Sequence, residues 1–248
     1  MTDLSINLNK IALIRNSREG NYPDVVAFAQ LCIDQGADGI TVHPRPDQRH
    51  IRPDDVRRLA ALVKPLANVE FNVEGNPFAP AMGSYPGFIE LVKETMPDQC
   101  TLVPDGDDQL TSDHGFDLTQ SGQQLRPIID QLHALGIRVS LFMDPDLAQI
   151  ELAKEIGADR IELYTGPYAA AWGTDQQESL FQQHLAAAEL STRLGMGVNA
   201  GHDLNLHNLG KFASIPSLLE VSIGHAFTVD SLTLGMAKTV QSYKALLG

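Results

Sequence analysis

Gly39-Ile-Thr-Val-His-Pro-Arg-Pro-Asp-Gln-Arg-His50 places a short apolar segment directly before a polar, positively charged loop. The apolar segment, residues 39–42, contains β-branched residues and is flanked by Gly and Pro, which predicts a short buried strand. The loop brings His43, Arg45 and His50 close to the end of that strand. In parallel sheets ligands bind at the carboxyl ends of strands, so these groups indicate a site that moves protons on a phosphorylated substrate. Taken alone, the stretch fits a solvated basic loop equally well.

The rest of the chain repeats this alternation of strand and helix. The predicted strands are residues 4–9, 39–42, 68–74, 100–104, 138–143, 160–165, 197–202 and 219–224. The predicted helices are residues 23–35, 53–64, 88–95, 123–135, 147–156, 178–194 and 230–247, and a polar loop covers residues 105–121. Strands separated by helices in this way predict an α/β protein, a (β/α)8 TIM barrel that forms a single domain over residues 1–248.

Two similar turns support the barrel. Gly36-Ala-Asp-Gly39 and Gly157-Ala-Asp-Arg160 look like the same helix-to-strand turn used twice, as expected of a repeated structural unit. A doubly wound sheet is the alternative fold, but no G-x-G-x-x-G follows the first predicted strand.

Composition limits the class of protein. The 248 residues include 43% hydrophobic residues, which is enough for a substantial core, and the net charge is −13. This charge argues against nucleic acid or an anionic membrane as a partner, although a small phosphorylated ligand stays possible. The N-terminus does not resemble a signal peptide, and no apolar run reaches the ~18 residues of a membrane span. Cys32 and Cys100 are predicted to be small buried residues of a cytoplasmic protein.

Polar side chains gather at the ends of the predicted strands. They are Asn7, Asn9, His43, Glu74, Glu162, Tyr164, Asn199, His202, Ser222 and His225. In a barrel these ends surround one mouth, and histidines and carboxylates that meet there form a general acid/base set. Ile223-Gly-His-Ala226 predicts a phosphate site at the start of a helix, and Arg15, Arg18, Arg45 and His50 are candidates for a second one.

No metal site is predicted. The first strand has Asn7-Leu-Asn9 where barrel hydrolases hold their ion with a His-x-His motif, and no H-E-x-x-H occurs. A three-histidine site made by His43, His202 and His225 is the alternative.

Several of these segments resemble the pyridoxine 5′-phosphate synthase family of deoxyxylulose-5-phosphate-dependent vitamin B6 biosynthesis. The segments include Asn7-Leu-Asn-Lys-Ile-Ala12, Arg15-Asn-Ser-Arg18, residues 36–43 with Arg49-His50, Asn72-Val-Glu74, Leu102-Val-Pro104, Ser140-Leu-Phe142, Ile161-Glu-Leu-Tyr-Thr-Gly166, Val198-Asn-Ala-Gly-His202 and Ile223-Gly-His-Ala226. The resemblance implies a cytoplasmic (β/α)8 barrel with extra helices that assembles through dimers to octamers. It also implies catalysis without a metal or another cofactor.

The activity that the resemblance implies is a ring-closing condensation. Its substrates are 3-amino-2-oxopropyl phosphate and 1-deoxy-D-xylulose 5-phosphate, and its products are pyridoxine 5′-phosphate, phosphate and water. By resemblance, His43 and Glu74 accept protons, His202 donates one, and Glu162 stabilises a charged transition state. The amino-ketone phosphate contacts Asn7, Arg18, Gly224 and His225, with Asp203 close by, and the pentulose phosphate contacts Arg45, His50 and Thr111, with Asn9 and Lys10 nearby.

The chain departs from the family pattern at a few positions. Asn9-Lys10 stands where many members carry Asp-His, Asp203 stands where many have Gly, and the loop 75–87 looks longer than usual. Two other functions therefore stay open. One is a barrel isomerase or aldolase-like enzyme that acts on another phosphorylated sugar, and the other is a barrel that binds phosphorylated metabolites without turnover. The loop 105–121, which carries Thr111, is a candidate lid.

Overall fold

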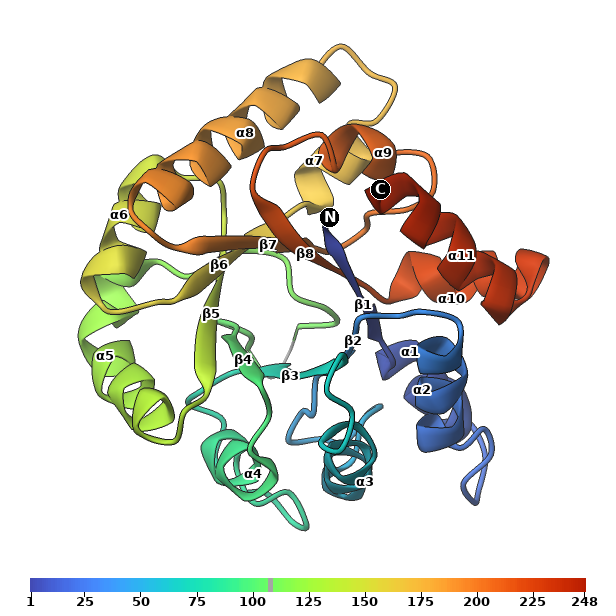
Figure 1. The fold of residues 1–248 in the computed structure, drawn as a ribbon. Helices are drawn as coiled ribbons and strands as arrows, with labels where there is room; N and C mark the ends of the chain where they lie inside the picture. Colours follow the sequence, from blue (N-terminus) through green and yellow to red (C-terminus); the bar gives the residue numbers. More distant parts are fainter. Residues whose placement is uncertain (107–108) are drawn as a thin grey trace.

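The computed structural model describes residues 1–106 and 109–248, and within them eight parallel strands form a closed barrel (Figure 1). Each strand pairs with the next one along the chain, and β8 pairs with β1 to close the ring. The strands are β1 (Asp3–Asn7), β2 (Gly39–Val42), β3 (Glu70–Gly75), β4 (Gln99–Leu102), β5 (Arg138–Met143), β6 (Arg160–Tyr164), β7 (Gly197–Gly201) and β8 (Leu218–Ile223). The predicted (β/α)8 fold is confirmed, and the doubly wound alternative is wrong.

Helices surround the barrel (Figure 1). In the described part of the chain they are α1 (Asn9–Asn16), α2 (Val25–Asp34), α3 (Pro53–Val63), α4 (Phe88–Thr95), α5 (Leu118–Ala134), α6 (Leu147–Glu155), α7 (Gly166–Ala170), α8 (Gln177–Arg193), α9 (Leu209–Phe212), α10 (His225–Leu234) and α11 (Met236–Leu247). Within the described residues, two helices follow each of the strands β1, β6 and β8, and one helix follows each of the other strands. Three helices are therefore additional to one helix per strand, which confirms the expected extra helices.

Aspartate caps decide where two helices begin. The Asp24 side chain accepts a hydrogen bond from the backbone N–H of Val26, so α2 begins at Val25 and not at Pro23. The Asp117 side chain caps α5 in the same way, so this helix begins inside the predicted loop 105–121 and not at residue 123. Residues 107 and 108 of that loop lie outside the described residues.

Other element boundaries also differ from the sequence prediction, and two of these differences have a clear local cause. The predicted strand 4–9 ends at Asn7, because the Asn7 side-chain oxygen accepts a hydrogen bond from the backbone N–H of Asn9 at 3.0 Å and α1 begins there. The predicted helix 230–247 is two helices, α10 and α11. Gly235 separates them with a φ of 78°, a left-handed conformation that a continuous helix does not allow.

The inside of the barrel is polar next to the site. Ser5, Thr41, Asn72 and Thr101, from four neighbouring strands, are buried and bonded in a row. Their side-chain contacts measure 2.7 Å between the first two, 3.4 Å between the next two and 3.2 Å between the last two. The alternate strand residues, such as Leu4 and Ile6 of β1, belong to the apolar core instead. Strand side chains that point inward are therefore available to bind polar ligands at the carboxyl end of the barrel.

Candidate active site

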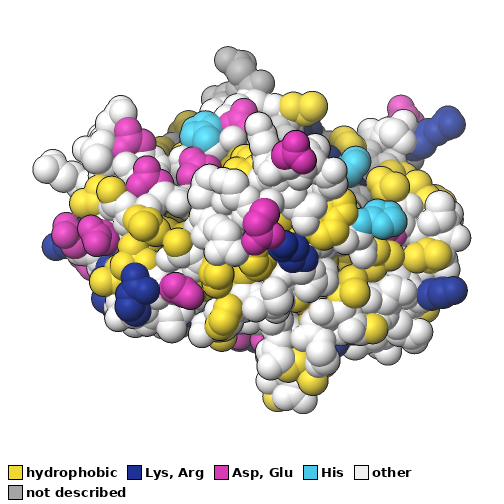
Figure 2. All heavy atoms as spheres, turned by 90° about the horizontal axis from the view of Figure 1, so that it is seen from above, with side chains coloured by type: hydrophobic (Ala, Val, Ile, Leu, Met, Phe, Trp, Pro, Cys, Tyr) yellow, Lys and Arg dark blue, Asp and Glu magenta, His cyan; other side chains and the backbone are white. Residues whose placement is uncertain are grey.

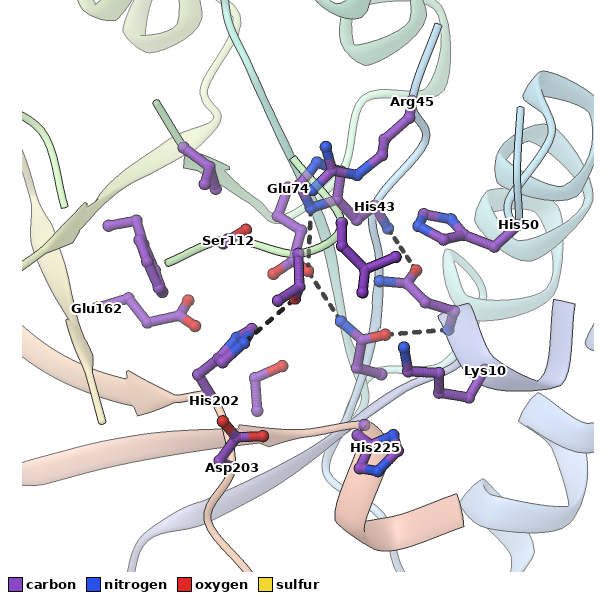
Figure 3. Close-up of a pocket in the computed structure, with 18 residues that line it drawn as sticks. Lys10, His43, Arg45, His50, Glu74, Ser112, Glu162, His202, Asp203 and His225 are labelled. Carbon is purple, nitrogen blue, oxygen red and sulfur yellow. Dashed lines mark hydrogen bonds and ion pairs between the residues drawn. The ribbon is translucent and has the colours of Figure 1, made fainter. Parts of the chain in front are cut away.

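A cavity of 310 Å³ lies at the carboxyl ends of the barrel strands (Figure 3). It is lined by Asn7, Asn9, Lys10, His43, Arg45, His50, Glu74, Val103, Leu110, Thr111, Ser112, Phe142, Glu162, His202, Asp203, Ser222, Gly224 and His225. Figure 3 shows His202 and Glu162 on one side of the cavity, Arg45 and His50 on the other, and Glu74 with His43 between them. The structure therefore brings together most of the site residues that the sequence predicted, but Arg15, Arg18, Tyr164 and Asn199 do not line the cavity. The Asn199 side chain donates a hydrogen bond to Glu220 at 3.1 Å instead.

His43 lies between two carboxylates. It follows β2 directly and is 4% exposed. Its Nδ1 is 3.5 Å from Oε1 of Glu74, and its Nε2 is 3.3 Å from Oδ2 of Asp105. An imidazole in this position can accept a proton from a substrate while a carboxylate stabilises the resulting charge.

Two asparagines, one at the end of β1 and one at the start of α1, hold the base region in place. The Asn7 amide donates a hydrogen bond to Oε1 of Glu74 at 2.8 Å. The Asn9 side-chain oxygen accepts a hydrogen bond from the backbone N–H of His43 at 2.9 Å. Asn9 lines the cavity, but its carbonyl oxygen is already used to fix the backbone at His43. An Asn supplies the acceptor for this backbone contact as well as an Asp would.

His202 stands on an unusual backbone turn after β7. Its φ is 86° and that of Asp203 is 60°, so two consecutive non-glycine residues adopt left-handed conformations. The His202 Nε2 lies 3.2 Å from the Thr111 hydroxyl, and the Tyr164 ring packs against the imidazole with centroids 5.4 Å apart. Burial lowers the pKa of His202, although the Asp203 carboxylate opposes this effect, so the neutral imidazole is favoured in the empty cavity.

Glu162 is the most enclosed carboxyl group of the cavity. Burial raises its pKa well above the usual value, and the carboxylates of Glu74 and Glu220 raise it further. The protonated acid is therefore favoured when the cavity is empty. Oε1 of Glu162 occupies the space beside Gly201, since a Cβ atom on Gly201 would lie only 2.5 Å from this oxygen.

Hydrogen-bond donors and cations gather around the other side of the cavity. The His50 Nδ1 accepts a hydrogen bond from the backbone N–H of Ile51 at 2.9 Å. Burial lowers the pKa of His50 to about 2, and the charges of His43, Arg45 and Lys10 lower it as well. His50 is therefore neutral, and its proton is on Nε2, where it can be donated to a ligand. Among the described residues, no carboxylate lies within ion-pair distance of the Lys10 ammonium group.

The loop after β8 has the form of an anion site. Helix α10 begins at His225, and Gly224 is its N-cap residue. A Cβ at Gly224 would lie 3.0 Å from the Cβ of Asn7, so glycine allows the backbone to approach β1. Backbone N–H groups at a helix N-terminus attract phosphate groups.

The arginines that follow β1 do not lie where the sequence predicted. Arg18 comes after the end of α1, where its side chain is exposed and does not line the cavity. Arg15 is buried at 1% exposure, because it pairs with Asp55 at 2.5 Å and donates to the His50 carbonyl at 3.0 Å. Arg15 therefore supports the loop that carries His50 and is not a phosphate ligand.

Sequence reasoning missed several residues of the site, including Asp105, Ser112 and Phe142. Asp105 contacts both His43 and Arg45, and Ser112 donates to it at 3.0 Å. Phe142 lies at the inward-facing end of β5 and packs against the His202 ring, with centroids 6.4 Å apart. An acid that follows a strand by a few residues was the only available signal for Asp105. Within residues 1–106 and 109–248, the alternative metal site is not formed, because no three His, Cys, Asp or Glu side chains could together hold a metal ion.

The chain is similar to curated proteins along almost its entire length. Residues 4–248 match the family described as pyridoxal phosphate biosynthesis protein PdxJ. The chain is 55% identical over 247 residues to the pyridoxine 5′-phosphate synthase of Xanthomonas axonopodis pv. citri, with 99% of this chain and 96% of the relative covered. It is 52% identical over 247 residues to the protein of that name from Xylella fastidiosa, with coverages of 99% and 95%.

Solved structures support the fold alone. The tryptophan synthase α chain of Legionella pneumophila matches with a TM-score of 0.66 at 13% identity, and 99% of this chain and 91% of that chain are covered. The 3-hexulose-6-phosphate synthase of Salmonella typhimurium matches with a TM-score of 0.64 at 16% identity, with coverages of 99% and 98%.

Proposed function

This chain belongs to the family of the pyridoxal phosphate biosynthesis protein PdxJ, and we propose that it catalyses the pyridoxine 5′-phosphate synthase reaction. The proposed substrates are 3-amino-2-oxopropyl phosphate and 1-deoxy-D-xylulose 5-phosphate, which give pyridoxine 5′-phosphate, phosphate and water. One observation carries the proposal beyond the likeness to relatives. Acid and base groups from four strand ends, His43, Glu74, Glu162 and His202, line a single cavity.

The proposed chemistry needs many proton transfers but no external oxidant or reductant. An amine adds to a ketone to form a Schiff base, water and phosphate leave, and the ring closes. We assign His43 and Glu74 as proton acceptors, because each is held by an asparagine of β1 or α1 and faces the cavity. A positioned acid–base group of this kind typically contributes ~10²–10⁴-fold to the rate.

The pKa shifts of His202 and Glu162 indicate how these two residues take up their roles. Because burial lowers the pKa of His202, this residue needs a bound anion before it can act as a cationic proton donor. A phosphate dianion next to the imidazole raises the pKa of His202 and so favours the protonated form. Glu162 starts as a neutral acid, and a positive charge that develops beside it favours its ionised form. Substrate binding thus prepares both groups for their roles.

Two regions of the cavity are proposed to hold the two phosphate groups. The amino-ketone phosphate is assigned to Gly224 and His225 at the start of α10, beside Asn7 and Asp203. The pentulose phosphate is assigned to the opposite side, to Lys10, Arg45, His50 and Thr111. Lys10 acts there as a point charge without a carboxylate partner among the described residues. Arg18 is not included, because its side chain is outside the cavity.

Self-association in the cytoplasm is proposed as well. Helices α1 and α10 are in contact and expose large apolar side chains. These are Leu13 at 43%, Ile14 at 46%, Val229 at 47% and Leu232 at 79% exposure. Burying such side chains against a second copy is favourable, which supports a dimer and larger assemblies.

No helix in the described part of the chain is long and apolar enough to cross a membrane. The face of the molecule shown in Figure 2 mixes acidic, basic and apolar side chains.

A two-substrate turnover assay tests the function. Purified protein is mixed with 1-deoxy-D-xylulose 5-phosphate and freshly generated 3-amino-2-oxopropyl phosphate, and both phosphate release and pyridoxine 5′-phosphate absorbance are followed. We expect both signals to rise together, at equal molar rates. Phosphate release without the product absorbance would mean a different reaction, and binding of both ligands with neither signal would mean a barrel without turnover.

A further inference from the structure

Asp105 is a buried carboxylate that no proposed role has yet used. It follows β4 by three residues, is 5% exposed and does not line the cavity. The Asn76 side chain donates to its backbone carbonyl at 2.7 Å, which fixes the chain at this point. Asp105 thus lies directly behind the residues that face the substrate.

One oxygen of Asp105 faces three polar side chains. Oδ2 accepts hydrogen bonds from Nη2 of Arg45 and from the Ser112 hydroxyl, the latter at 3.0 Å, and it lies 3.3 Å from Nε2 of His43. The guanidinium group uses one of its five donor positions for this contact, so its other N–H groups stay available to a ligand. A single buried carboxylate therefore contacts both the proposed base and a proposed phosphate ligand.

The surroundings of His43 decide which of its ring nitrogens carries the proton. Among the described residues, two carboxylates lie beside the imidazole, Glu74 from β3 and Asp105 from the loop after β4. Arg45 pairs with Asp105, and the His50 ring lies 6.2 Å from that of His43. The Asp105 oxygen lies 3.3 Å from Nε2 and is therefore closer to the ring than the Glu74 oxygen, which lies 3.5 Å from Nδ1. The closer carboxylate favours a proton on Nε2, which leaves the Nδ1 lone pair toward Glu74.

We propose that Asp105 is a positioning residue that holds His43 in the tautomer with its proton on Nε2, so that Nδ1 is the nitrogen that accepts the substrate proton. Carboxylates orient histidines in this way in enzymes that use an imidazole as a base. The inference rests on the proposed function for its catalytic consequence, but the tautomer itself is a property of the ligand-free protein. Asp105 also pairs with the buried Arg45 cation and so keeps this side chain at the cavity wall.

Asp105→Asn is the variant that separates these contacts. The amide oxygen can still accept hydrogen bonds from Arg45 and Ser112, whereas the negative charge near Nε2 is lost. Among the described residues, Glu74 is then the only carboxylate beside the ring, so the proton of neutral His43 should move toward Nδ1. Asp113→Asn is the matched control, because Asp113 is on the same segment, is 59% exposed and pairs with His114 at 2.5 Å.

The experiment uses ¹⁵N-labelled histidine and NMR of the full-length protein at a pH above the titration range of histidine, with the His43 signals assigned by their loss in His43→Ala. We expect a protonated Nε2 in the wild type and in Asp113→Asn, and a shift toward protonated Nδ1 in Asp105→Asn. A wild type with protonated Nδ1 overturns the proposal, even if the variant does not fold or the protein shows no turnover.

Steady-state kinetics then test the consequence for the reaction. We expect kcat of Asp105→Asn to fall at least tenfold, while KM for the pentulose phosphate changes less than threefold, because Arg45 keeps its acceptor. Asp113→Asn should keep both constants. A rise in KM with unchanged kcat would show that Asp105 serves Arg45 alone, which would refute the role at His43.

Discussion

Replacing Glu74 with Gln should remove most of the turnover and leave the fold intact. The glutamine has nearly the same shape, and its amide oxygen can accept the 2.8 Å hydrogen bond that Asn7 now donates to Oε1. Replacing the charged acceptor with a neutral one should lower the unfolding free energy by about 1 kcal/mol. The amide cannot accept a proton, however, and it removes the negative charge 3.5 Å from Nδ1 of His43. Loss of a positioned acid–base group predicts a fall in kcat of about 10²–10⁴-fold.

Glu70→Gln is the matched control, since it makes the same change on the same strand. Glu70 begins β3 at the end of the barrel that is opposite the cavity, and its 43% exposed side chain pairs with Arg138. An exposed pair of this kind contributes up to about 1 kcal/mol, so this variant should keep turnover within about twofold. The assay measures kcat from product absorbance and unfolding free energy from urea titration. A Glu74→Gln protein with the kcat of the wild type would refute the assignment of Glu74 as a proton acceptor.

Three other predictions concern the groups around the cavity and the barrel interior. Gly201→Ala should lower kcat and cost about 1–3 kcal/mol in a urea titration, because a Cβ would lie 2.5 Å from the Glu162 oxygen; unchanged values would mean that this carboxyl group is free to move. Asp203→Gly should stabilise the protein by about 0.5–1 kcal/mol, because the φ of 60° suits glycine, and a clear loss of stability would contradict this account of the turn. Burial raises the pKa of Glu220 to about 7, so the folded state holds a proton that the unfolded state releases, and stability should fall as pH rises from the ordinary glutamate value of 4.5 to about 7. The difference in unfolding free energy between the wild type and Glu220→Gln should therefore become smaller by about 3 kcal/mol across that pH range, because the glutamine does not titrate. A difference that is the same at all pH values in the range would argue against the raised pKa.

Strand positions and the convergence of strand-end residues were predictable from sequence. Apolar segments flanked by Gly or Pro located the strands, and the barrel topology then required His43, Glu74 and His202 to meet at one mouth. Such predictions succeed because the geometry of a closed parallel barrel leaves few places for a side chain at the end of a strand. The same logic extends to Gly224 and His225, which directly follow β8.

Some residues that lie farther from a strand end were not predictable in this way. Arg18 follows a helix, α1, that the sequence did not reveal, and this helix directs the side chain away from the cavity. Asp105 returns to the site through its contact with Arg45, and Ser112 donates a hydrogen bond to Asp105; both contacts depend on the tertiary path of the loop. The burial of His184 was not predictable either; this residue lies on the side of α8 that packs against the barrel and is 0% exposed. Local patterns do not encode such long-range contacts.

We propose that the ring closure takes place in the cavity formed by the strand ends. The most direct test is a crystal structure of the protein with pyridoxine 5′-phosphate and inorganic phosphate bound. We predict a pyridine ring in the cavity, with its polar atoms within about 3 Å of His43, Glu74 or His202, directly or through one water. We also predict a phosphate group at the backbone N–H groups of Gly224 and His225. Ordered product that is bound elsewhere on the protein, with these side chains unoccupied, would contradict the account.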